Sequence, residues 1–276
     1  MSNLVTIALK EIQEGLRNRW VTATTLLLAA LALSLTFLGN APTGSGIGSG
    51  RLDVVIVSLS SLTIFLIPLI ALLISHDAIV GEMERGTMLL LLSYPVGRTQ
   101  VILGKFCGHV VILAFATLIG YGAAAVALAA TGSGIDAASW LAFLSLIGSS
   151  VLLGAVFIAI GFLASTLVRQ RSTAAGVAIG VWLLFVLIYD MALLGLLVAD
   201  QGRTIGAGAL NALLIANPTD AYRLLNFGSG GAGALTGMSG VVGNATLSPV
   251  SLSLALALWT LLPLGASMLV FSRKEL

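Results

Sequence analysis

Six long apolar stretches, separated by more polar segments, set the pattern of this chain. They cover residues 21–38, 54–75, 106–130, 140–167, 173–198 and 250–271. A helix needs about 20 mostly apolar residues to cross the hydrocarbon core of a bilayer, whereas β-barrel strands show shorter segments of alternating polarity. We therefore expect an all-α integral membrane protein with a transmembrane domain of six helices over residues 21–276.

Residues 1–20 carry a different, amphipathic pattern. Apolar residues recur there at helical spacing, at Val5, Ala8, Leu9, Ile12, Leu16 and Trp20. Charged residues such as Lys10 and Glu14 fill the other face. This predicts an interfacial elbow helix along the cytoplasmic surface, in contact with membrane lipids and with Trp20 at headgroup level. The alternative is an N-terminal helix that faces solvent and makes no membrane contact.

Composition and charge narrow the class further. The chain is 58% hydrophobic and only 9% charged, whereas a soluble domain has about a quarter of its residues charged. This excludes a soluble enzyme and a disordered protein. The net charge of +2 leaves no electrostatic footprint for nucleic acid, so we expect no nucleic-acid partner.

The basic residues predict the orientation. With the N-terminus inside, the cytoplasmic segments hold Lys10, Arg17, Arg19, Arg85, Arg98, Lys105, Arg169, Arg171, Arg273 and Lys274. The outer segments hold only Arg51, Arg203 and Arg223. The positive-inside bias therefore predicts an N-in, C-in topology.

The cytoplasmic segment of residues 76–105 is the most informative part of the chain. Charged residues at its start precede an apolar run, and then Ser93, Tyr94, Pro95 and Gly97 break the pattern before another helical stretch. This predicts two short helices joined by a turn at the membrane surface. Their apolar side is expected to pack either against a protein partner or against the base of the helix bundle, and the periodicity does not show which.

This segment resembles the first intracellular region of ABC-2-type transporter permeases. The matching residues are Glu82, Glu84, Gly86, Thr87, Tyr94, Pro95 and Arg98, followed by Gly104 and Lys105. The elbow, the six spans and the short C-terminal tail agree with the same family. The resemblance implies a type V exporter-like fold in the bacterial inner membrane. It also implies two copies of a cytoplasmic ABC ATPase subunit and a second copy of this chain as partners.

In that family the first intracellular helix couples the permease to the ATPase. The resemblance therefore places Glu82, Glu84, Arg85, Gly86 and Thr87 at the ATPase contact, with Tyr94, Pro95 and Arg98 shaping the turn beside it. Arg169 and Arg171 form either a second, smaller contact or part of the general positive-inside bias.

Catalytic residues are not expected in this chain. A phosphate-binding loop needs two glycines at the right spacing followed by lysine, and the sequence around Gly81 and Gly86 has no such lysine. We therefore expect no cofactor on this chain, and we expect ATP and Mg on the partner ATPase.

Within the family, the chain is most similar to permeases of the transporters for nitrous oxide reductase maturation. The likeness rests on the elbow, on the ERGTM stretch and on Asn217, Pro218, Asp220 and Arg223 in the outer loop of residues 199–249. It implies a role in copper-site assembly and a periplasmic β-helical solenoid partner near these four residues. A mechanical scaffold that passes no substrate is the alternative function, and a flexible linker is the simpler interpretation of residues 227–244.

Few residues offer chemistry inside the membrane. His76, Cys107 and His109 fall near the same ends of two spans, but the methionines are scattered and we expect no metal site. Asp190 is the acidic residue deepest in an apolar run, so it is a candidate for gating or for the dimer interface unless it simply reaches water. Gly176 and Gly180 form a GxxxG motif that favours packing inside the subunit over a dimer seam.

Overall fold

The computed structural model describes residues 3–38, 51–130, 137–200, 205–227 and 247–274, and this part of the chain is helical with no strand. The helices are α1 (Asn3–Leu16), α2 (Arg19–Leu38), α3 (Arg51–Ser75), α4 (Val80–Glu84), α5 (Thr87–Leu92), α6 (Arg98–Ala130), α7 (Ala137–Leu167), α8 (Arg171–Leu183), the π-helix η1 (Leu184–Ile188), α9 (Tyr189–Asp200), α10 (Ala207–Ala216), α11 (Pro218–Phe227) and α14 (Pro249–Arg273). The Trp20 side chain and nearly all of the predicted linker 227–244 lie outside the described residues.

The prediction of an all-α membrane protein is confirmed. Five helical segments among the described residues are long and apolar enough to cross a membrane, and they centre on α3, α6, α7, α8 to α9, and α14. Helices α1 and α2 meet at 66°, and when this bent pair is counted as one span the number of spans is six. The helix that holds the predicted third span, α6, begins at Arg98, because the apolar residues after Arg98 continue the helix without a break.

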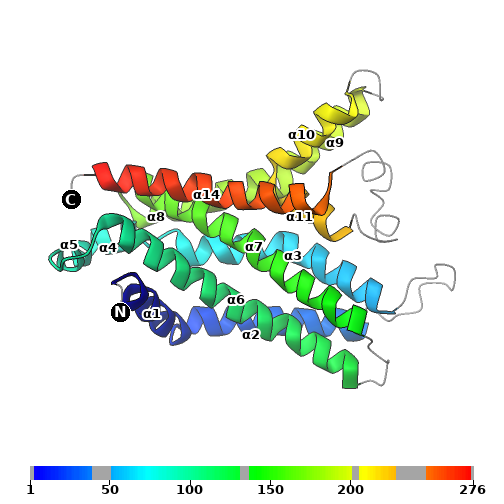
Figure 1. Cartoon of the computed structure of the whole chain (residues 1–276), viewed down its shortest axis with the longest axis horizontal. Coiled ribbons are helices and arrows are strands. Elements are labelled where there is room, and N and C mark those ends of the chain that lie inside the picture. The colour runs from blue at the N-terminus through cyan, green and yellow to red at the C-terminus, as the bar shows by residue number, and fades with distance from the viewer. Residues whose placement is uncertain (1–2, 39–50, 131–136, 201–204, 228–246, 275–276) are drawn as a thin grey trace.

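Both chain ends lie at one end of the bundle, together with α4 and α5 (Figure 1). Helices α10 and α11 lie toward the opposite end. Six crossings return the chain to its starting side, so this arrangement is the one that an N-in, C-in topology requires. We therefore call the end with the termini the cytoplasmic end and the other the periplasmic end.

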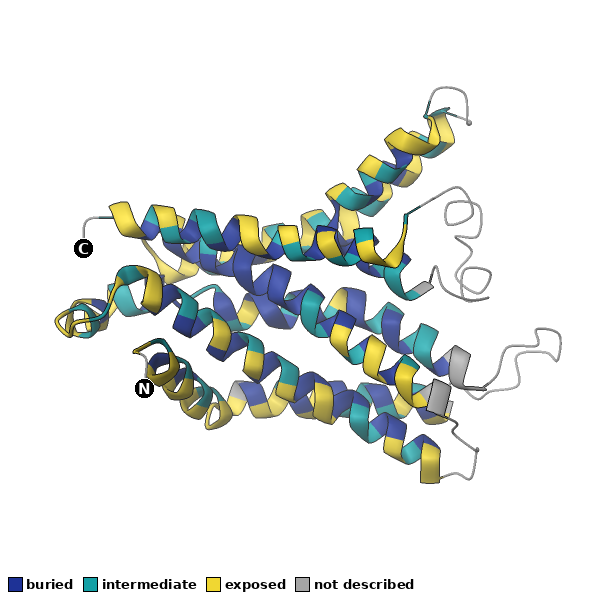
Figure 2. Ribbon diagram, viewed as in Figure 1, coloured by how far each residue is buried: buried dark blue, intermediate teal, exposed yellow. Residues whose placement is uncertain are grey.

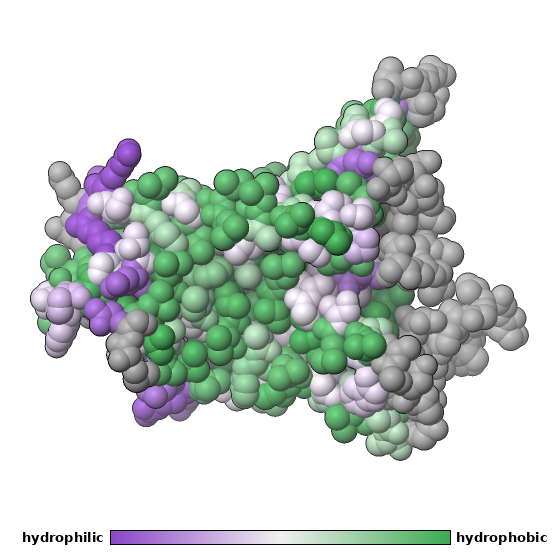
Figure 3. All heavy atoms as spheres, in the orientation of Figure 1, coloured by the Kyte–Doolittle hydropathy of each residue, from purple (hydrophilic) through white to green (hydrophobic). Residues whose placement is uncertain are grey.

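Helix α7 is the most buried span, and it packs against α3, α6 and α14 (Figure 2). Its aromatic residues Phe143, Phe157 and Phe162 are buried in the core. In contrast, leucines such as Leu258, Leu261 and Leu262 on α14 are exposed. Figure 3 shows that apolar residues cover the middle of the molecule and that hydrophilic ones gather at the cytoplasmic end. An apolar outer surface of this extent suits a hydrocarbon solvent.

Two glycines allow the elbow helix α1 to pack closely on α6. A Cβ atom at Gly104 would lie 2.8 Å from Cβ of Ile7, and one at Gly108 would lie 2.6 Å from Cβ of Glu11. Gly104 and Gly108 thus form a GxxxG seam. By contrast, no atom lies within 4 Å of a Cβ at Gly176 or Gly180, so the expectation that this second motif packs inside the subunit is wrong among the described residues.

We expect Gly108→Ala to loosen this seam. The added methyl group would meet the Glu11 Cβ and the backbone oxygen of Ala8, and overpacking of this kind costs about 1–3 kcal/mol. The matched control is Gly122→Ala on the same helix, where nothing lies within 4 Å of the new Cβ. Thermal unfolding in nanodiscs should show a lower midpoint for Gly108→Ala alone, and equal midpoints for the two variants would contradict the close packing.

Candidate functional site

Helices α4 and α5 form a short hairpin-like segment at the cytoplasmic end (Figure 1). The predicted break at residues 93–97 separates α5 from α6, so the helical stretch that opens at Arg98 is the start of a long helix and not a second short one. Gly86 joins them with φ of 71°, in the left-handed region that glycine adopts without strain. On α5, Met88 is buried, whereas Leu89 and Leu90 are 59% and 66% exposed. The segment therefore packs on the bundle with one side and leaves a second apolar side uncovered. Of the two alternatives from the sequence, packing on the base of the bundle holds for the Met88 side, and the exposed side is open to a partner.

The start of α4 is fixed to the cytoplasmic ends of α7 and α8. The Ser165 hydroxyl oxygen accepts hydrogen bonds from the backbone N–H groups of Ile79 and Val80, at 3.1 and 3.0 Å. Arg171 forms an ion pair of 2.5 Å with Asp77. The backbone N–H of Arg171 donates to Glu84 Oε1 at 2.9 Å. Arg171 and Glu84 thus have partners within the chain, whereas Arg169 is exposed.

Lys105 ties three helices together. Its ammonium lies 2.7 Å from Glu11 Oε1 on α1 and 2.8 Å from Glu82 Oε1 on α4, and its side chain is only 3% exposed. The pKa of Glu11 is lowered although burial by itself would raise it, because Lys105 and then His109 stabilise the charged carboxylate. Removing an ammonium from water costs several kcal/mol unless carboxylates and hydrogen bonds compensate. This triad of Glu11, Lys105 and Glu82 therefore fixes the elbow and α4 relative to α6.

The turn after α5 contacts the C-terminal tail and the N-terminal helix. The Arg98 guanidinium donates to the carbonyl oxygens of Phe271, Ser272 and Lys274, at 2.8–3.1 Å. A cation at the C-terminus of α14 also compensates the helix dipole. The Pro95 carbonyl accepts a hydrogen bond of 2.9 Å from the Asn3 amide. The exposed residues Tyr94 and Thr87 remain on the surface.

At the periplasmic end, the predicted Asn-Pro-x-Asp segment packs against a π-helix. A π-helix shifts the backbone hydrogen-bond pattern by one residue. In η1 the Phe185 carbonyl accepts from the Asn217 amide at 3.0 Å and from the Thr219 hydroxyl at 3.1 Å. Asn217 and Thr219 are fully buried. Their partners are thus within the chain, on the fifth span.

Arg223 joins the same region to α9. Its guanidinium lies 2.6 Å from Asp190 Oδ2 and 2.7 Å from Asp220 Oδ1. Burial raises the pKa of Asp220 to about 7, with a further contribution from the neighbouring Asp190 carboxylate, and Arg223 opposes both effects. Asp190 is therefore a member of an ion-paired cluster, and it does not lie alone in the membrane. Asn217, Pro218 and Asp220 are buried, so in this structure they offer no surface to a periplasmic partner.

A buried hydroxyl cluster connects α11 to the spans around it. The Thr63 and Tyr121 hydroxyl groups lie 2.6 Å apart, and those of Ser150 and Tyr222 lie 3.2 Å apart. Tyr222 belongs to α11 and Ser150 to α7, whereas Thr63 lies on α3 and Tyr121 on α6. Isolated serine, threonine and tyrosine residues within apolar runs gave no signal from which the sequence could predict this cluster.

The candidate metal ligands do not form a common site. The His76 ring contacts the carbonyl of Leu73 at 2.9 Å, and the His109 ring is buried edge-on to Phe162. Cys107 is exposed. In the part of the chain that the structure describes, no group of three or more His, Cys, Asp or Glu residues is arranged to hold a metal ion.

Comparison with known proteins gives this architecture a family. Residues 5–276 match the family described as ABC-2 family transporter protein. The chain belongs to the ABC-2 family. It is 47% identical over 272 residues to the probable ABC transporter permease protein NosY of Pseudomonas aeruginosa, covering 98% of each chain. It is 45% identical over 276 residues to the NosY protein of Stutzerimonas stutzeri, covering 99% of each chain.

As an ABC-2 family member, the chain is the membrane-spanning subunit of an ABC transporter and is not itself an enzyme. It is a multi-pass protein of the bacterial inner membrane, in agreement with its apolar helices. A permease of this family works with a separate ATPase subunit and as a dimer of membrane subunits. These findings confirm the resemblance that the sequence of the α4–α5 segment indicated.

We expect Lys105→Met to destabilise the protein by about 3–5 kcal/mol, because two buried carboxylates then lose their cation. The matched control is Lys10→Met, which removes an exposed ion pair with Glu14 at 3.4 Å and should change stability by less than about 1 kcal/mol. Chemical unfolding in mixed micelles measures both. A Lys105→Met variant as stable as the control would contradict the assigned importance of the triad.

The raised pKa of Asp220 predicts a pH-dependent stability. In the unfolded chain an aspartate has a pKa of about 3.9, so between about pH 4 and 7 only the folded chain holds this proton. Stability should therefore fall as pH rises through that window and then level off. Thermal unfolding from pH 4 to pH 8 should show this slope, and Asp220→Asn should abolish it. Asp77→Asn at the other end should keep it, and an unchanged slope in Asp220→Asn would contradict the assignment.

Proposed function

We propose that this chain, as a homodimer, couples ATP hydrolysis on two cytoplasmic ATPase subunits to work at the periplasmic side, in the copper-site assembly of nitrous oxide reductase. The main support for the coupling role is the exposed apolar side of α5, which follows α4 and its buried ion pairs with the triad of Glu11, Lys105 and Glu82. The similarity to two NosY proteins over nearly the whole chain supports the biological setting.

The contacts of α4 and α5 define how a movement there reaches the bundle. The triad connects α4 to the elbow and to α6, and the Arg171–Asp77 pair connects its approach to α8. Arg98, directly after the segment, holds the end of α14. A displacement of α4 by the ATPase therefore acts on α1, α6 and α8 through charged contacts, and on α14 through Arg98 at the start of α6.

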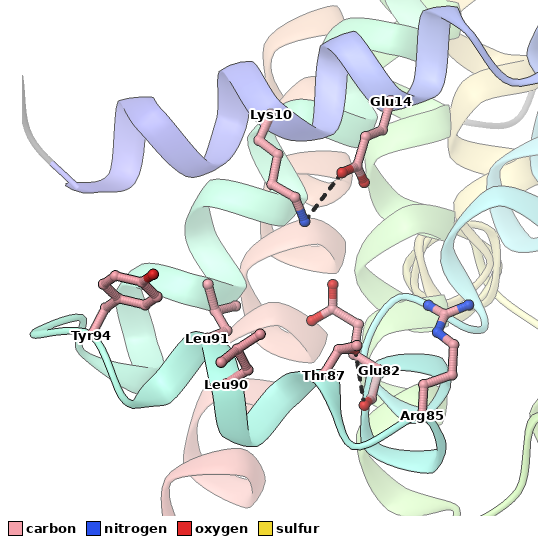
Figure 4. A pocket seen from close by; sticks show the side chains of 8 residues that line it. All are labelled: Lys10, Glu14, Glu82, Arg85, Thr87, Leu90, Leu91 and Tyr94. Carbon is pink, nitrogen blue, oxygen red and sulfur yellow. Dashed lines mark hydrogen bonds and ion pairs between the residues drawn. The ribbon is translucent and has the colours of Figure 1, made fainter.

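The ATPase subunit holds ATP and Mg in this proposal. This chain binds the ATPase through the α4–α5 segment and connects that segment mechanically to the helix bundle. Glu82, Arg85 and Thr87 lie on one side of the α4–α5 segment, with Tyr94 farther along it (Figure 4), and Gly86 joins the two helices. Arg171 and Glu84 act chiefly within the permease, because each already has a partner there.

The outer partner in this proposal is a periplasmic β-helical solenoid that sits on the periplasmic end. Asn217, Asp220 and Arg223 act indirectly here, since they hold α11 against η1 and α9. A rigid α11 gives such a partner a defined platform.

A mechanical scaffold that passes no substrate is a second candidate function. It is favoured by the dense packing of α7, the central helix, and by the paired hydroxyl groups of the buried cluster. Reconstituted vesicles with labelled copper or sulfur species distinguish the two, because the scaffold predicts ATP hydrolysis without uptake or release.

We expect Leu89→Glu to separate the permease from its ATPase. The carboxylate falls on the exposed apolar side of α5, where Leu89 makes little contact within the chain, so the permease should fold normally. In cells, nitrous oxide reductase made with this variant should contain much less copper than that made with the wild type. Co-purification of the ATPase and the copper content of the reductase measure the two effects.

The control for this experiment is Gln13→Glu, which adds the same group at an exposed position on the elbow. It should retain both the ATPase and a copper-loaded reductase. An ATPase that co-purifies equally with both variants would contradict the coupling role of α5. Normal copper content in cells that lack this chain would contradict the role in copper-site assembly.

A further inference from the structure

A pocket of about 360 Å³ lies at the cytoplasmic end between the elbow helix and the α4–α5 segment (Figure 4). Its lining combines charged and apolar side chains: Lys10, Glu14, Glu82, Arg85, Thr87, Leu90, Leu91 and Tyr94. It is therefore bordered by the surface that the proposed function assigns to the ATPase. The volume is large enough for one long side chain of a partner.

One polar atom in this pocket wall lacks a partner. Glu82 Oε1 accepts a hydrogen bond from Lys105 at 2.8 Å. Glu82 Oε2 is buried, and it has no hydrogen-bond partner within the described part of the chain. A buried acceptor left unpaired costs about 1–3 kcal/mol, and more when it is charged. The carboxylate is thus prepared for a donor that the isolated chain does not supply.

The surrounding charges favour a cationic donor. Glu11 and Glu82 share the single ammonium of Lys105, so the triad carries one net negative charge. Lys10 is already paired with Glu14. Figure 4 shows the Arg85 guanidinium extending away from the Glu82 carboxylate. An anionic occupant such as a lipid phosphate would meet Arg85, but it would also lie beside the Glu14 and Glu82 carboxylates and would leave Glu82 Oε2 without a donor.

The apolar part of the lining fits the rest of such a side chain. Leu90 and Leu91 offer a surface for the methylene stem of an arginine, and the Tyr94 ring offers a face for its guanidinium. A guanidinium also suits a carboxylate geometrically, because it presents several fixed donors.

We propose that this pocket receives an arginine side chain of the cytoplasmic ATPase, whose guanidinium donates to Glu82 Oε2. The inference rests on the proposed function, and it names the contact that gives the α4–α5 docking surface its specificity. Because Glu82 also holds Lys105, the incoming arginine joins the triad and connects the ATPase directly to the elbow and α6.

The test is the affinity of the purified ATPase for the permease in nanodiscs. Glu82→Gln replaces the carboxylate with a neutral amide of the same shape and should weaken binding at least about tenfold, as expected for a charged hydrogen bond. The matched control is Glu11→Gln, which takes the other carboxylate from Lys105 but does not line the pocket. It should weaken binding clearly less than Glu82→Gln does, because it leaves the Glu82 Oε2 acceptor of the pocket in place.

A third variant, Thr87→Arg, supplies a guanidinium from the exposed pocket wall itself. It should satisfy Glu82 internally and exclude the incoming side chain, so it should also weaken binding. Equal weakening by Glu82→Gln and Glu11→Gln would show that the triad acts only by holding the fold, and would overturn the proposal. Wild-type affinity for both Glu82→Gln and Thr87→Arg would overturn it as well.

A photo-crosslinker in place of Leu89 separates this inference from the proposed function. If the crosslinker captures the ATPase while Glu82→Gln binds like the wild type, docking on α5 stands and the arginine contact is wrong. If the crosslinker never captures the ATPase, docking on α5 itself is wrong. Mass spectrometry of the captured peptide should identify a segment with an arginine close to α5.

Discussion

The burial of one ammonium group, that of Lys105, constrains the cytoplasmic half of this protein. A lysine that is 3% exposed at the base of a membrane span needs carboxylates close by. Glu11 on the elbow and Glu82 on α4 supply them, so neither helix can move far without exposing a charge to an apolar interior. The glycine seam makes this geometry accessible, because Gly104 and Gly108 let the elbow approach α6 closely enough for Glu11 to reach Lys105. Packing and electrostatics thus depend on each other here.

The periplasmic end has the same arrangement of one cation between two carboxylates: Arg223 pairs with Asp190 on α9 and Asp220 on α11. Between the two clusters the chain is nearly free of charge, which accounts for the low charged fraction of 9%. The charges that remain in and beside the spans fix helices to one another at the two ends. They do not line a polar path through the middle of the described bundle.

The sequence predicted the fold from features that act locally. Apolar runs of 18 or more residues gave the spans, and helical periodicity gave the elbow. The sequence could not predict the contacts within the two charged clusters, because these contacts join residues that are far apart in the chain. Lys105 and Glu11 are 94 positions apart, and Arg223 and Asp190 are 33 apart. The π-helix η1 also has no local signal in the sequence. The side chains that donate hydrogen bonds to its Phe185 carbonyl, Asn217 and Thr219, lie more than 30 positions farther along the chain. The Gly104 and Gly108 motif was present in the sequence, but its partner helix was not evident from it.

The fifth span carries an ion pair toward each end of the bundle. Arg171 at its cytoplasmic start is paired with Asp77 beside α4, and Asp190 farther along is paired with Arg223 on α11. Between them lies η1, where the altered hydrogen-bond pattern offers the Phe185 carbonyl to α11. The π-segment is the place where α11 contacts this span. In the proposed function, a force on α4 therefore reaches the periplasmic end through a continuous helix and two ion pairs, and this transmission requires no polar channel.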